Sequence, residues 1–551
     1  MTNLLQRMLP TVQKPARYTG GEYNQVVKPL DQVDVRIAFC FPDTYELGMS
    51  NLGMRILYGV MNEMDGVWCE RVFAPWGDME AAMTAHQLPL WALESQDPAR
   101  DFDLIAFTIG YETVSLYQKA KREDWTKDRF LEEVSHIPGV YVPSFYTHTY
   151  HPDGTLAAIT PREGAPETVT KRIVEDLDRA YFPTKTIVPT TEIVHDRSNL
   201  EVFRGCIRGC RFCQAGFSCR PVRKKSPEVL YRQAVESLTD SGNHELTLAS
   251  LSTSDYRGLK ELTDALIPYC MEQKVNLSVP SLRADNFSRE LMEKLQTVRK
   301  SGLTFAPEAG TQRLRDVINK NLTEEEILDT CARAFSGGWN NVKLYFMLGL
   351  PTETDEDVLG IAKLVYQVIK TWQAHASNKK RGLRVHVATA YFVPKPFTPF
   401  QWEQQIPPEE YLRRTRLLKN AMPSKAVVYN WHAPDLSRLE AALARGDRRL
   451  GPVIAWAVEH GAHLDGWDEY FQYGLWLDAF AACGLDPDFY TVRGYGEGEL
   501  LPWQTLSVGV DPGFLLRERR RAYEGLVTPD CRQACAGCGA NRLLKEVGCD
   551  A

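Results

Sequence analysis

Three cysteines stand close together in one short basic stretch of the chain. Cys206, Cys210 and Cys213 have the spacing C-x3-C-x2-C within RGCIRGCRFCQAGFSCRPVRKK, residues 204–225. A structural zinc site usually takes four ligands, typically as two separated pairs of cysteines. Three thiolates instead suit a 4Fe–4S cluster that leaves one iron free for another ligand. The spacing therefore favours an iron–sulfur cluster, with a zinc knuckle as the alternative.

The residues around these thiols refine the prediction. Cys219 follows six residues after Cys213, beside an Arg-Pro pair that makes it a poor fourth ligand. Neighbouring positive charge favours thiolates over thiols. The sequence therefore predicts that the thiols are activated by the arginines of the same stretch, which are Arg204, Arg208 and Arg211.

Strand-like and helix-like segments alternate regularly on both sides of the cysteines. This order predicts either a doubly wound parallel sheet or an open barrel, in which ligands bind at the carboxyl ends of the strands. Every residue singled out below within this region falls at such an end. The expected strands are residues 199–205, 244–251, 275–282, 301–308, 341–351 and 383–394.

Two further regions flank the alternating one. Before it, apolar runs at 35–40 and 103–110 with a helical segment between them predict an open α/β domain. After about residue 403 the apolar pattern turns helical. We therefore expect an α/β protein with an N-terminal Rossmann-like domain and linker at 1–180, a central barrel at 190–402 and a mostly α domain at 403–551.

Composition and charge limit the classes of partner that the protein is expected to bind. The 551 residues carry a net charge of −7, so a nucleic-acid site would have to be a local basic patch. Arg517–Arg521, with the arginines at 413, 414 and 416, is expected to be a solvated helix face, with an RNA-binding patch as the alternative. We find no signal-peptide pattern and no apolar run near the ~18 residues of a membrane span. A cytoplasmic protein is expected, in which clustered cysteines indicate metal rather than disulfides.

Phe212, directly before the last of the three cysteines, completes the pattern C-x3-C-x-F-C. This pattern resembles the signature of the radical S-adenosylmethionine (SAM) superfamily. The resemblance implies a partial (β/α)6 barrel and a 4Fe–4S cluster held by Cys206, Cys210 and Cys213. It also implies that SAM binds the free iron and that an electron donor such as flavodoxin or ferredoxin reduces the cluster. Reductive cleavage of SAM then gives a 5′-deoxyadenosyl radical that abstracts hydrogen from a substrate.

Motifs at later strand ends extend the resemblance. They are SLSTSD (250–255), SVPSLRAD (278–285), FAPEAGTQRLR (305–315) and LGLPTETDED (348–357). In the superfamily, turns at these places contact the methionine, ribose and adenine parts of SAM. The resemblance thus implies that SAM is bound by Phe212, Ser252, Ser281, Arg283, Glu308, Gly349 and Pro351.

The segment FVPKPFTPFQW (392–402), with stretches in both flanking regions, is similar to a family of radical enzymes that has an N-terminal cobalamin-binding-like domain and a C-terminal three-cysteine motif. Common cobalamin domains carry D-x-H-x-x-G, whose histidine binds cobalt. Here Asp43 to Gly48 reads DTYELG, with Tyr45 at the histidine position. Because a phenol is a poor cobalt ligand and the domain looks short, we expect weak cobalamin binding or none.

A second cysteine group lies near the carboxyl terminus. Cys531, Cys535 and Cys538 repeat the C-x3-C-x2-C spacing, and Cys549 is a candidate fourth ligand. An auxiliary 4Fe–4S cluster, a zinc knuckle and unligated cysteines are the alternatives. We expect this group near the barrel opening.

Three hypotheses for the function follow. The first is a radical SAM enzyme acting on an unidentified substrate, a small molecule or RNA. The second, nested in it, is a methyl- or methylthio-transferase acting on RNA, as in the subgroup that the Glu308 and Gly349 motifs resemble. The third is a non-catalytic metal-binding scaffold.

Overall fold

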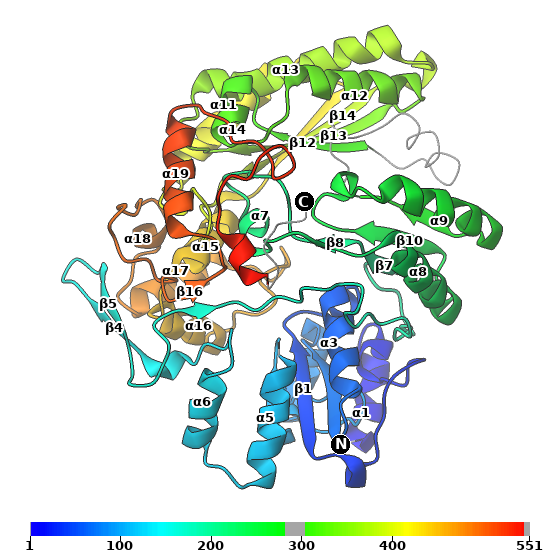
Figure 1. Ribbon diagram of the computed structural model, residues 1–551, viewed down its shortest axis with the longest axis vertical. Helices are drawn as coiled ribbons and strands as arrows, with labels where there is room; N and C mark the ends of the chain where they lie inside the picture. The colour runs from blue at the N-terminus through cyan, green and yellow to red at the C-terminus, as the bar shows by residue number, and fades with distance from the viewer. Residues whose placement is uncertain (1, 109, 281–302, 545–551) are drawn as a thin grey trace.

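The computed structural model describes residues 2–108, 110–280 and 303–544 and is a mixed α/β structure (Figure 1). Its N-terminal sheet is parallel, with the order β2-β1-β3. The strands β1 and β2 are largely buried on both faces because helices cover them, and Val35, Ile37 and Val67 have no exposed surface. The elements here are β1 (Val35–Phe41), β2 (Val67–Phe73), β3 (Leu104–Ala106), α1 (Thr2–Met8), α3 (Leu52–Asn62), α4 (Gly77–Ala85), α5 (Tyr111–Arg122) and α6 (Lys127–Ser135).

The central region forms two parallel sheets. One has the order β11-β10-β7 and the other β12-β13-β14-β15. Among the described residues no ladder joins β11 to β12, and the predicted single run of strands is divided there. The strands are β7 (Ser198–Glu201), β10 (Glu245–Ala249), β11 (Asn276–Ser278), β12 (Leu303–Glu308), β13 (Asn341–Leu348), β14 (Arg384–Tyr391) and β15 (Val427–Trp431).

Helices cover one face of these sheets. In β13, Val342, Leu344 and Phe346 are buried against them, whereas Lys343 and Tyr345 face the other way and are exposed. The covering helices are α8 (Pro227–Ser241), α9 (Leu259–Gln273), α12 (Glu324–Ser336), α13 (Asp355–His375) and α14 (Pro408–Ala421). The strand β15 was not anticipated, because it lies where the apolar pattern indicated helices.

The linker and the C-terminal region are interleaved. Residues 139–190 contain the hairpin β4 (Tyr146–Tyr150) and β5 (Leu156–Pro161), and β6 (Val169–Thr170) pairs with β16 (Leu506–Ser507). The remaining helices are α15 (Pro434–Arg445), α16 (Leu450–Glu459), α17 (Tyr473–Ala482), α18 (Pro487–Thr491) and α19 (Pro512–Tyr523). None of the described helices is long and apolar enough to cross a membrane.

Candidate active site

The three-cysteine loop is held between two short antiparallel strands, β8 (Phe203–Arg204) and β9 (Arg223–Lys224), which follow the carboxyl end of β7. Its two ends cross at Gly205, where φ is 92° and a Cβ atom would lie 2.7 Å from the Pro221 carbonyl oxygen. Only glycine fits such a crossing without strain. The loop, residues 205–222, is therefore closed at its base and lies at the carboxyl end of β7, which is called the mouth of the central sheets below.

The three thiols lie near one another, with Cys210 buried and Cys206 and Cys213 partly exposed. Burial raises the pKa of Cys206 to about 12, and the nearby Cys210 and Cys213 add to the rise. The sulfur of Cys206 accepts the backbone N–H of Arg208 at 3.4 Å, and that of Cys213 accepts the N–H of Gly216 at 3.4 Å. Such N–H···S bonds help to hold a sulfur as a metal ligand. The helix that starts after Cys213 is α7 (Gln214–Ser218).

The predicted activation of these thiols by neighbouring arginines is wrong. Every one of the three guanidinium groups is paired with a carboxylate, and burial raises the pKa of both Cys206 and Cys213 instead. Sequence proximity revealed the arginines but not the acids that neutralise them. The pairs are Arg204 with Glu201, Arg208 with Asp255 and Asp530, and Arg211 with Glu518.

Arg211 instead anchors the loop. Its side chain is fully buried, with bonds to Glu518 at 3.1 Å and to the carbonyl oxygens of Val317 at 2.9 Å and Leu526 at 2.7 Å. Asn319 adds a bond from its side-chain amide to the Gly209 carbonyl at 3.1 Å. The loop is thus fastened both to the segment after β12 and to the C-terminal region.

Phe212 and Ser252 have structural partners. Phe212 packs against an apolar cluster that includes Leu314, Leu350 and Phe392. Ser252 is buried after β10, and its hydroxyl donates to Asp255 at 2.6 Å. Because Asp255 also binds Arg208, Ser252 belongs to the network that fixes the cysteine loop.

Glu308 lies at the end of β12 and close to a thiol. The strand pairing shifts register between Phe305 and Glu308, and φ of Glu308 is 67°. Its carboxylate forms an ion pair with Lys320 at 3.2 Å, and both groups act on the Cys213 thiol electrostatically. The structure thus brings a predicted SAM-binding residue next to a predicted cluster ligand.

The turn after β13 is held by a buried carboxylate. Gly349 has φ of 90°, and its N–H donates to the Glu353 carboxylate at 2.7 Å. Glu353 also binds Arg414 at 2.6 Å. Pro351 is buried in the same turn. Burial raises the pKa of Glu353 to about 7, against the lowering by the Gly349 N–H and Arg414.

The other predicted SAM residues, Ser281 and Arg283, lie outside the described residues, as does Cys549.

The second cysteine group lies against the first loop (Figure 1). The N–H of Cys531 donates to the Ile207 carbonyl at 3.2 Å, and Asp530 binds Arg208 at 3.1 Å. The thiols of Cys538 and Cys535 both influence that of Cys531, and Cys535 is exposed. The contacts therefore bring two cysteine groups from distant parts of the chain together.

Tyr45, at the position of a cobalt-binding histidine, points into the N-terminal core. It is 1% exposed, and its hydroxyl donates to Glu22 at 2.9 Å. Glu22 in turn binds the fully buried Arg71 at 2.8 Å. The Tyr45 side chain is thus engaged within its own domain.

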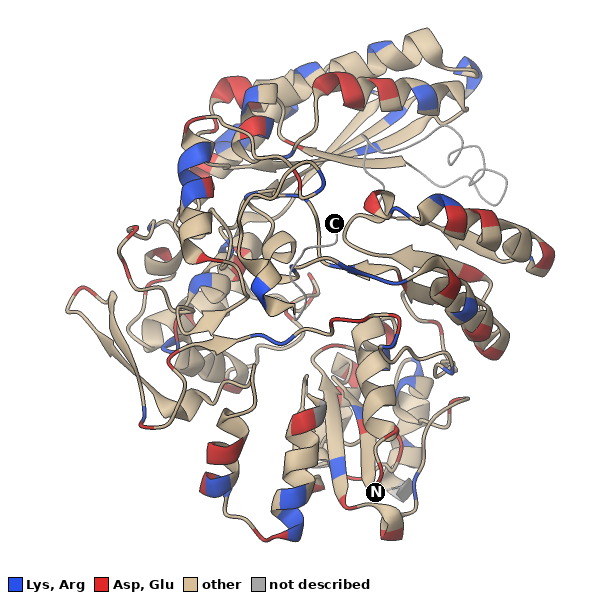
Figure 2. Ribbon diagram, viewed as in Figure 1, with Lys and Arg blue, Asp and Glu red and all other residues tan. Residues whose placement is uncertain are grey.

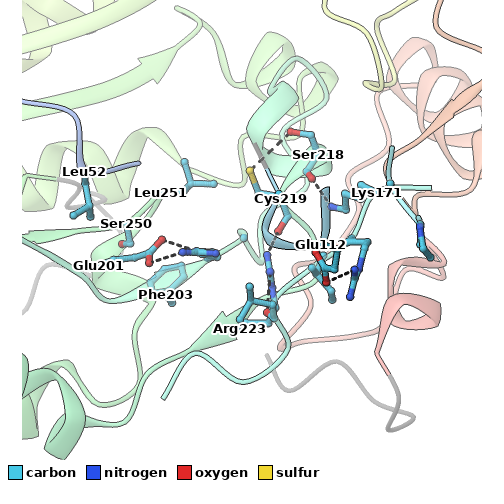
Figure 3. Close-up of a pocket in the computed structure, with 18 of the residues that line it drawn as sticks. Leu52, Glu112, Lys171, Glu201, Phe203, Ser218, Cys219, Arg223, Ser250 and Leu251 are labelled. Atoms are coloured by element: carbon cyan, nitrogen blue, oxygen red, sulfur yellow. Dashed lines mark hydrogen bonds and ion pairs between the residues drawn. The ribbon is translucent and has the colours of Figure 1, made fainter. Parts of the chain in front are cut away.

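A large pocket separates the N-terminal sheet from the central mouth (Figure 3). Its volume is about 790 Å3. The ends of β7 and β10 line one side, and residues at the start of α3 and α5 line the other. Cys219 lines it too, beside Lys171 and Arg223. Sequence reasoning missed Lys171, since nothing in its linker segment marks it.

A single metal ion and an iron–sulfur cluster require different distances between their ligand sulfurs. Within the described ranges, no group of three or more His, Cys, Asp or Glu side chains is arranged to hold a single metal ion. A zinc ion with Zn–S bonds of about 2.3 Å needs its sulfurs within roughly 4 Å of one another. A 4Fe–4S cluster spreads its ligands over a wider cube. Cys206, Cys210 and Cys213, which lie close enough to influence one another electrostatically, are the residues that would hold a cluster.

The arginines of the predicted RNA patch are largely neutralised. Figure 2 shows acidic and basic residues interleaved over the outer helices. Phosphates would have to displace these carboxylates to bind there. The pairs are Arg413 with Asp355 and Glu410, Arg414 with Glu353 and Glu410, Arg519 with Glu403 and Glu497, Arg520 with Glu497, and Arg521 with Glu518.

Comparison with protein families agrees with this site. Residues 200–365 match the model "Radical SAM superfamily", and residues 53–116 match "Radical SAM proteins, N-terminal". The chain therefore carries a radical SAM domain, which indicates an enzyme and implies a 4Fe–4S cluster and SAM as cofactors.

Among relatives, an uncharacterized protein of Methanocaldococcus jannaschii is 25% identical over 76% of this chain and 90% of its own length. The threonylcarbamoyladenosine tRNA methylthiotransferase MtaB of Bacillus subtilis is 23% identical over 36% of this chain and 44% of its own. The solved radical SAM methyltransferase TsrM of Kitasatospora setae, with cobalamin and a [4Fe-4S] cluster bound, covers 67% of this chain and 74% of its own at 11% identity and a TM-score of 0.44.

Proposed function

We propose that this enzyme holds a 4Fe–4S cluster through Cys206, Cys210 and Cys213 and cleaves SAM reductively to modify a substrate at the mouth of the central sheets. When bound, the reduced cluster supplies the electron that splits SAM into methionine and a 5′-deoxyadenosyl radical. The observation that carries the proposal is the group of three neighbouring thiols beside Glu308, at the carboxyl ends of the strands.

The residues of the chain have separate tasks in this proposal. Burial around the thiols keeps water away, and the N–H groups of Arg208 and Gly216 orient two sulfurs. Glu353 holds the Gly349 turn in the shape that lets a planar ligand approach its backbone. SAM itself is assigned to Phe212, Ser252, Ser281, Arg283, Glu308, Gly349 and Pro351.

Assay of 5′-deoxyadenosine tests the proposal. The protein is reconstituted anaerobically with iron and sulfide, reduced with dithionite and supplied with SAM. Alanine at Cys206, Cys210 or Cys213 is expected to abolish 5′-deoxyadenosine, whereas the matched variant Cys219→Ala is expected to keep it. Full activity in Cys210→Ala would refute the assignment, and no product from the wild type would favour a non-catalytic metal scaffold.

Methyl or methylthio transfer to RNA is the second candidate. It is supported by partial likeness to methylthiotransferases, which span less than half of this chain and of their own lengths. The carboxylate-paired arginines weigh against it. Mass spectrometry of RNA nucleosides from cells with and without the gene decides: a lost methyl or methylthio mark supports it, and an unchanged set excludes it.

Two partners complete the proposal. A small one-electron carrier such as flavodoxin or ferredoxin reduces the cluster. Cobalamin is expected to bind weakly or not at all, because Tyr45 is committed to Glu22. Stoichiometric cobalamin absorption in the purified protein would contradict this expectation.

A further inference from the structure

Two cations at the 790 Å3 pocket carry an inference about its ligand. Lys171 comes from the linker and Arg223 from β9, and both lie beside Cys219 (Figure 3). The Lys171 ammonium donates to the carbonyl oxygens of Ser218 and Arg220, the latter at 2.7 Å. Arg223, 8% exposed, donates to the carbonyl oxygens of Pro221, Val174 and Cys219, each at 3.1 Å.

Neither cation has an acidic partner. The hydrogen bonds of Lys171 and Arg223 go to carbonyl oxygens, and no carboxylate of the described residues forms an ion pair with either; Glu201 acts on Arg223 only without direct contact. The two acids of the pocket are already used. Glu201 binds Arg204 through both oxygens, and Glu112 binds Arg172.

Such an arrangement is unfavourable without a counter-charge. Burying a cation away from acids costs free energy, and a second cation nearby adds repulsion. Burial and, to a smaller extent, the nearby Arg223 lower the pKa of Lys171 to about 8. A bound anion would remove this cost.

The rest of the lining describes the other part of the ligand. Phe203, Leu251 and Val174 present apolar surface, and Leu251 and Val174 are 46% and 44% exposed. Apolar side chains left open in a concave site suit an apolar body of a ligand.

We propose that this pocket binds an organic anion, a carboxylate or a phosphate monoester, with its charged group on Lys171 and Arg223 and its apolar body on Phe203 and Leu251. That this anion is the enzyme's substrate rests on the proposed function, since the pocket opens at the ends of β7 and β10. The anion site itself stands on the two cations alone.

Alkylation of Cys219 measures occupancy without turnover. The cluster-loaded protein is treated anaerobically with iodoacetamide, and the Cys219 peptide is quantified by mass spectrometry. Phenylacetate, phenyl phosphate and neutral phenylacetamide serve as probes, and the partly exposed Cys483, which belongs to neither cysteine group, is the internal reference for reagent reactivity. We expect an anionic probe to slow labelling of Cys219 and the neutral probe to leave it unchanged. Protection by phenylacetate alone assigns a carboxylate, and by phenyl phosphate alone a phosphate.

Variants separate the site from general effects. Lys171→Met is expected to raise the half-protecting concentration about tenfold or more, the usual loss for one charge-assisted hydrogen bond. Lys171→Arg, which keeps the charge and tests folding, and Lys363→Met on the outer face of α13 should retain protection. Equal protection by phenylacetamide, no protection by either anion, or undiminished protection in Lys171→Met would overturn the proposal. None of these results depends on 5′-deoxyadenosine formation, so failure here and failure of the proposed function are distinguishable.

Discussion

Glu308 combines a rare backbone conformation with a reactive neighbourhood. Its φ of 67° lies in the left-handed region, which costs a non-glycine residue roughly 1–3 kcal/mol. Such a conformation persists where the surrounding structure imposes it, often at functional sites. Here the register shift after Phe305 turns the carboxylate toward Lys320 and Cys213.

Replacing Glu308 should therefore affect SAM and not the cluster. We expect Glu308→Gln to keep the iron content and to lower SAM affinity about tenfold, since a charged acceptor becomes neutral. Equilibrium dialysis with SAM and iron analysis measure the two effects. Glu325→Gln, on an exposed part of α12, is the control. Unchanged affinity in Glu308→Gln would remove this residue from the SAM site.

Lys225 is a buried lysine near the cysteine loop, and its charge affects the free energy of unfolding. Its side chain is 1% exposed, donates to Gln233 at 2.9 Å and lies 4.1 Å from the Phe182 ring centre. Burial lowers its pKa to about 8. Between the folded pKa and the ordinary lysine value of about 10.4, the unfolded chain binds more protons, so stability rises with pH across that range. Below pH 8 the buried charge costs its full amount.

We expect Lys225→Met to stabilise the protein at pH 7 by about 1–3 kcal/mol, after the loss of the Gln233 bond. The gain should shrink as the pH rises from 8 to 10. Urea unfolding at several pH values measures it, with Lys363→Met as a matched surface change. A gain that does not depend on pH would show that repacking, and not charge, is responsible.

Single residues were predicted unevenly from the sequence. The cysteine group Cys206, Cys210 and Cys213 could be predicted from its spacing, because the ligands of one cluster can be neighbours in one loop. The acidic partners Asp530 of Arg208 and Glu518 of Arg211 could not be predicted, because they lie about 300 residues further along the chain. Lys171 gives no signal, since its role arises only where the linker meets β9.

At the scale of elements, α13 and the turn after β12 meet backbone to backbone. A Cβ atom on Gly310 would lie 2.3 Å from the Ile361 nitrogen and 2.5 Å from the Asp357 carbonyl oxygen. A Cβ atom on Gly360 would in turn lie 3.1 Å from the Gly310 carbonyl carbon. This contact lets α13 press against the turn that carries Glu308.

Gly310→Ala should consequently separate the two elements. We expect a loss of stability of about 1–3 kcal/mol, the usual cost of overpacking, together with weaker SAM binding. Thermal unfolding and equilibrium dialysis give the two readouts. Gly451→Ala, inside α16 with no atom within 4 Å of the added Cβ, should be neutral or stabilise by up to about 1 kcal/mol. Similar melting of both alanine variants would contradict the packing argument.

The strands were predicted better than their assembly. Six of the central strands follow the expected segments because buried parallel strands are apolar runs with clear ends. The seventh, β15, was missed because five residues in a helical context give little periodicity. How the strands assemble into sheets is a long-range property that no local pattern encodes.

At the scale of the whole molecule, the tail around Cys531, Cys535 and Cys538 closes on the first cysteine loop. Residues 526–539 have little regular structure, so a metal could order them; structural metal binding contributes roughly 10 kcal/mol or more in small domains. Exposed thiols such as Cys535 also oxidise readily unless ligated. We therefore expect a second metal centre here.

Metal analysis of the Cys206/Cys210/Cys213 triple-alanine variant isolates that centre. Retained iron of about four atoms per chain identifies a second 4Fe–4S cluster. One zinc per chain identifies a zinc knuckle. A quadruple variant that also carries Cys531→Ala should lose whichever metal remains. If the triple variant binds no metal, the prediction of a second centre is wrong.

The ion pairs of Arg208 with Asp255 and Asp530 also determine when the cysteine loop can be completed during translation. Asp530 is translated 317 residues after Cys213, by subtraction of their numbers. At roughly 5–20 residues per second, the loop waits about 15–60 seconds for its last carboxylate. During that interval its arginine lacks one counter-ion and its thiols lack their cover. We therefore expect a cluster to be inserted only after the chain is complete, and until then the thiols of the loop stay open to oxidation.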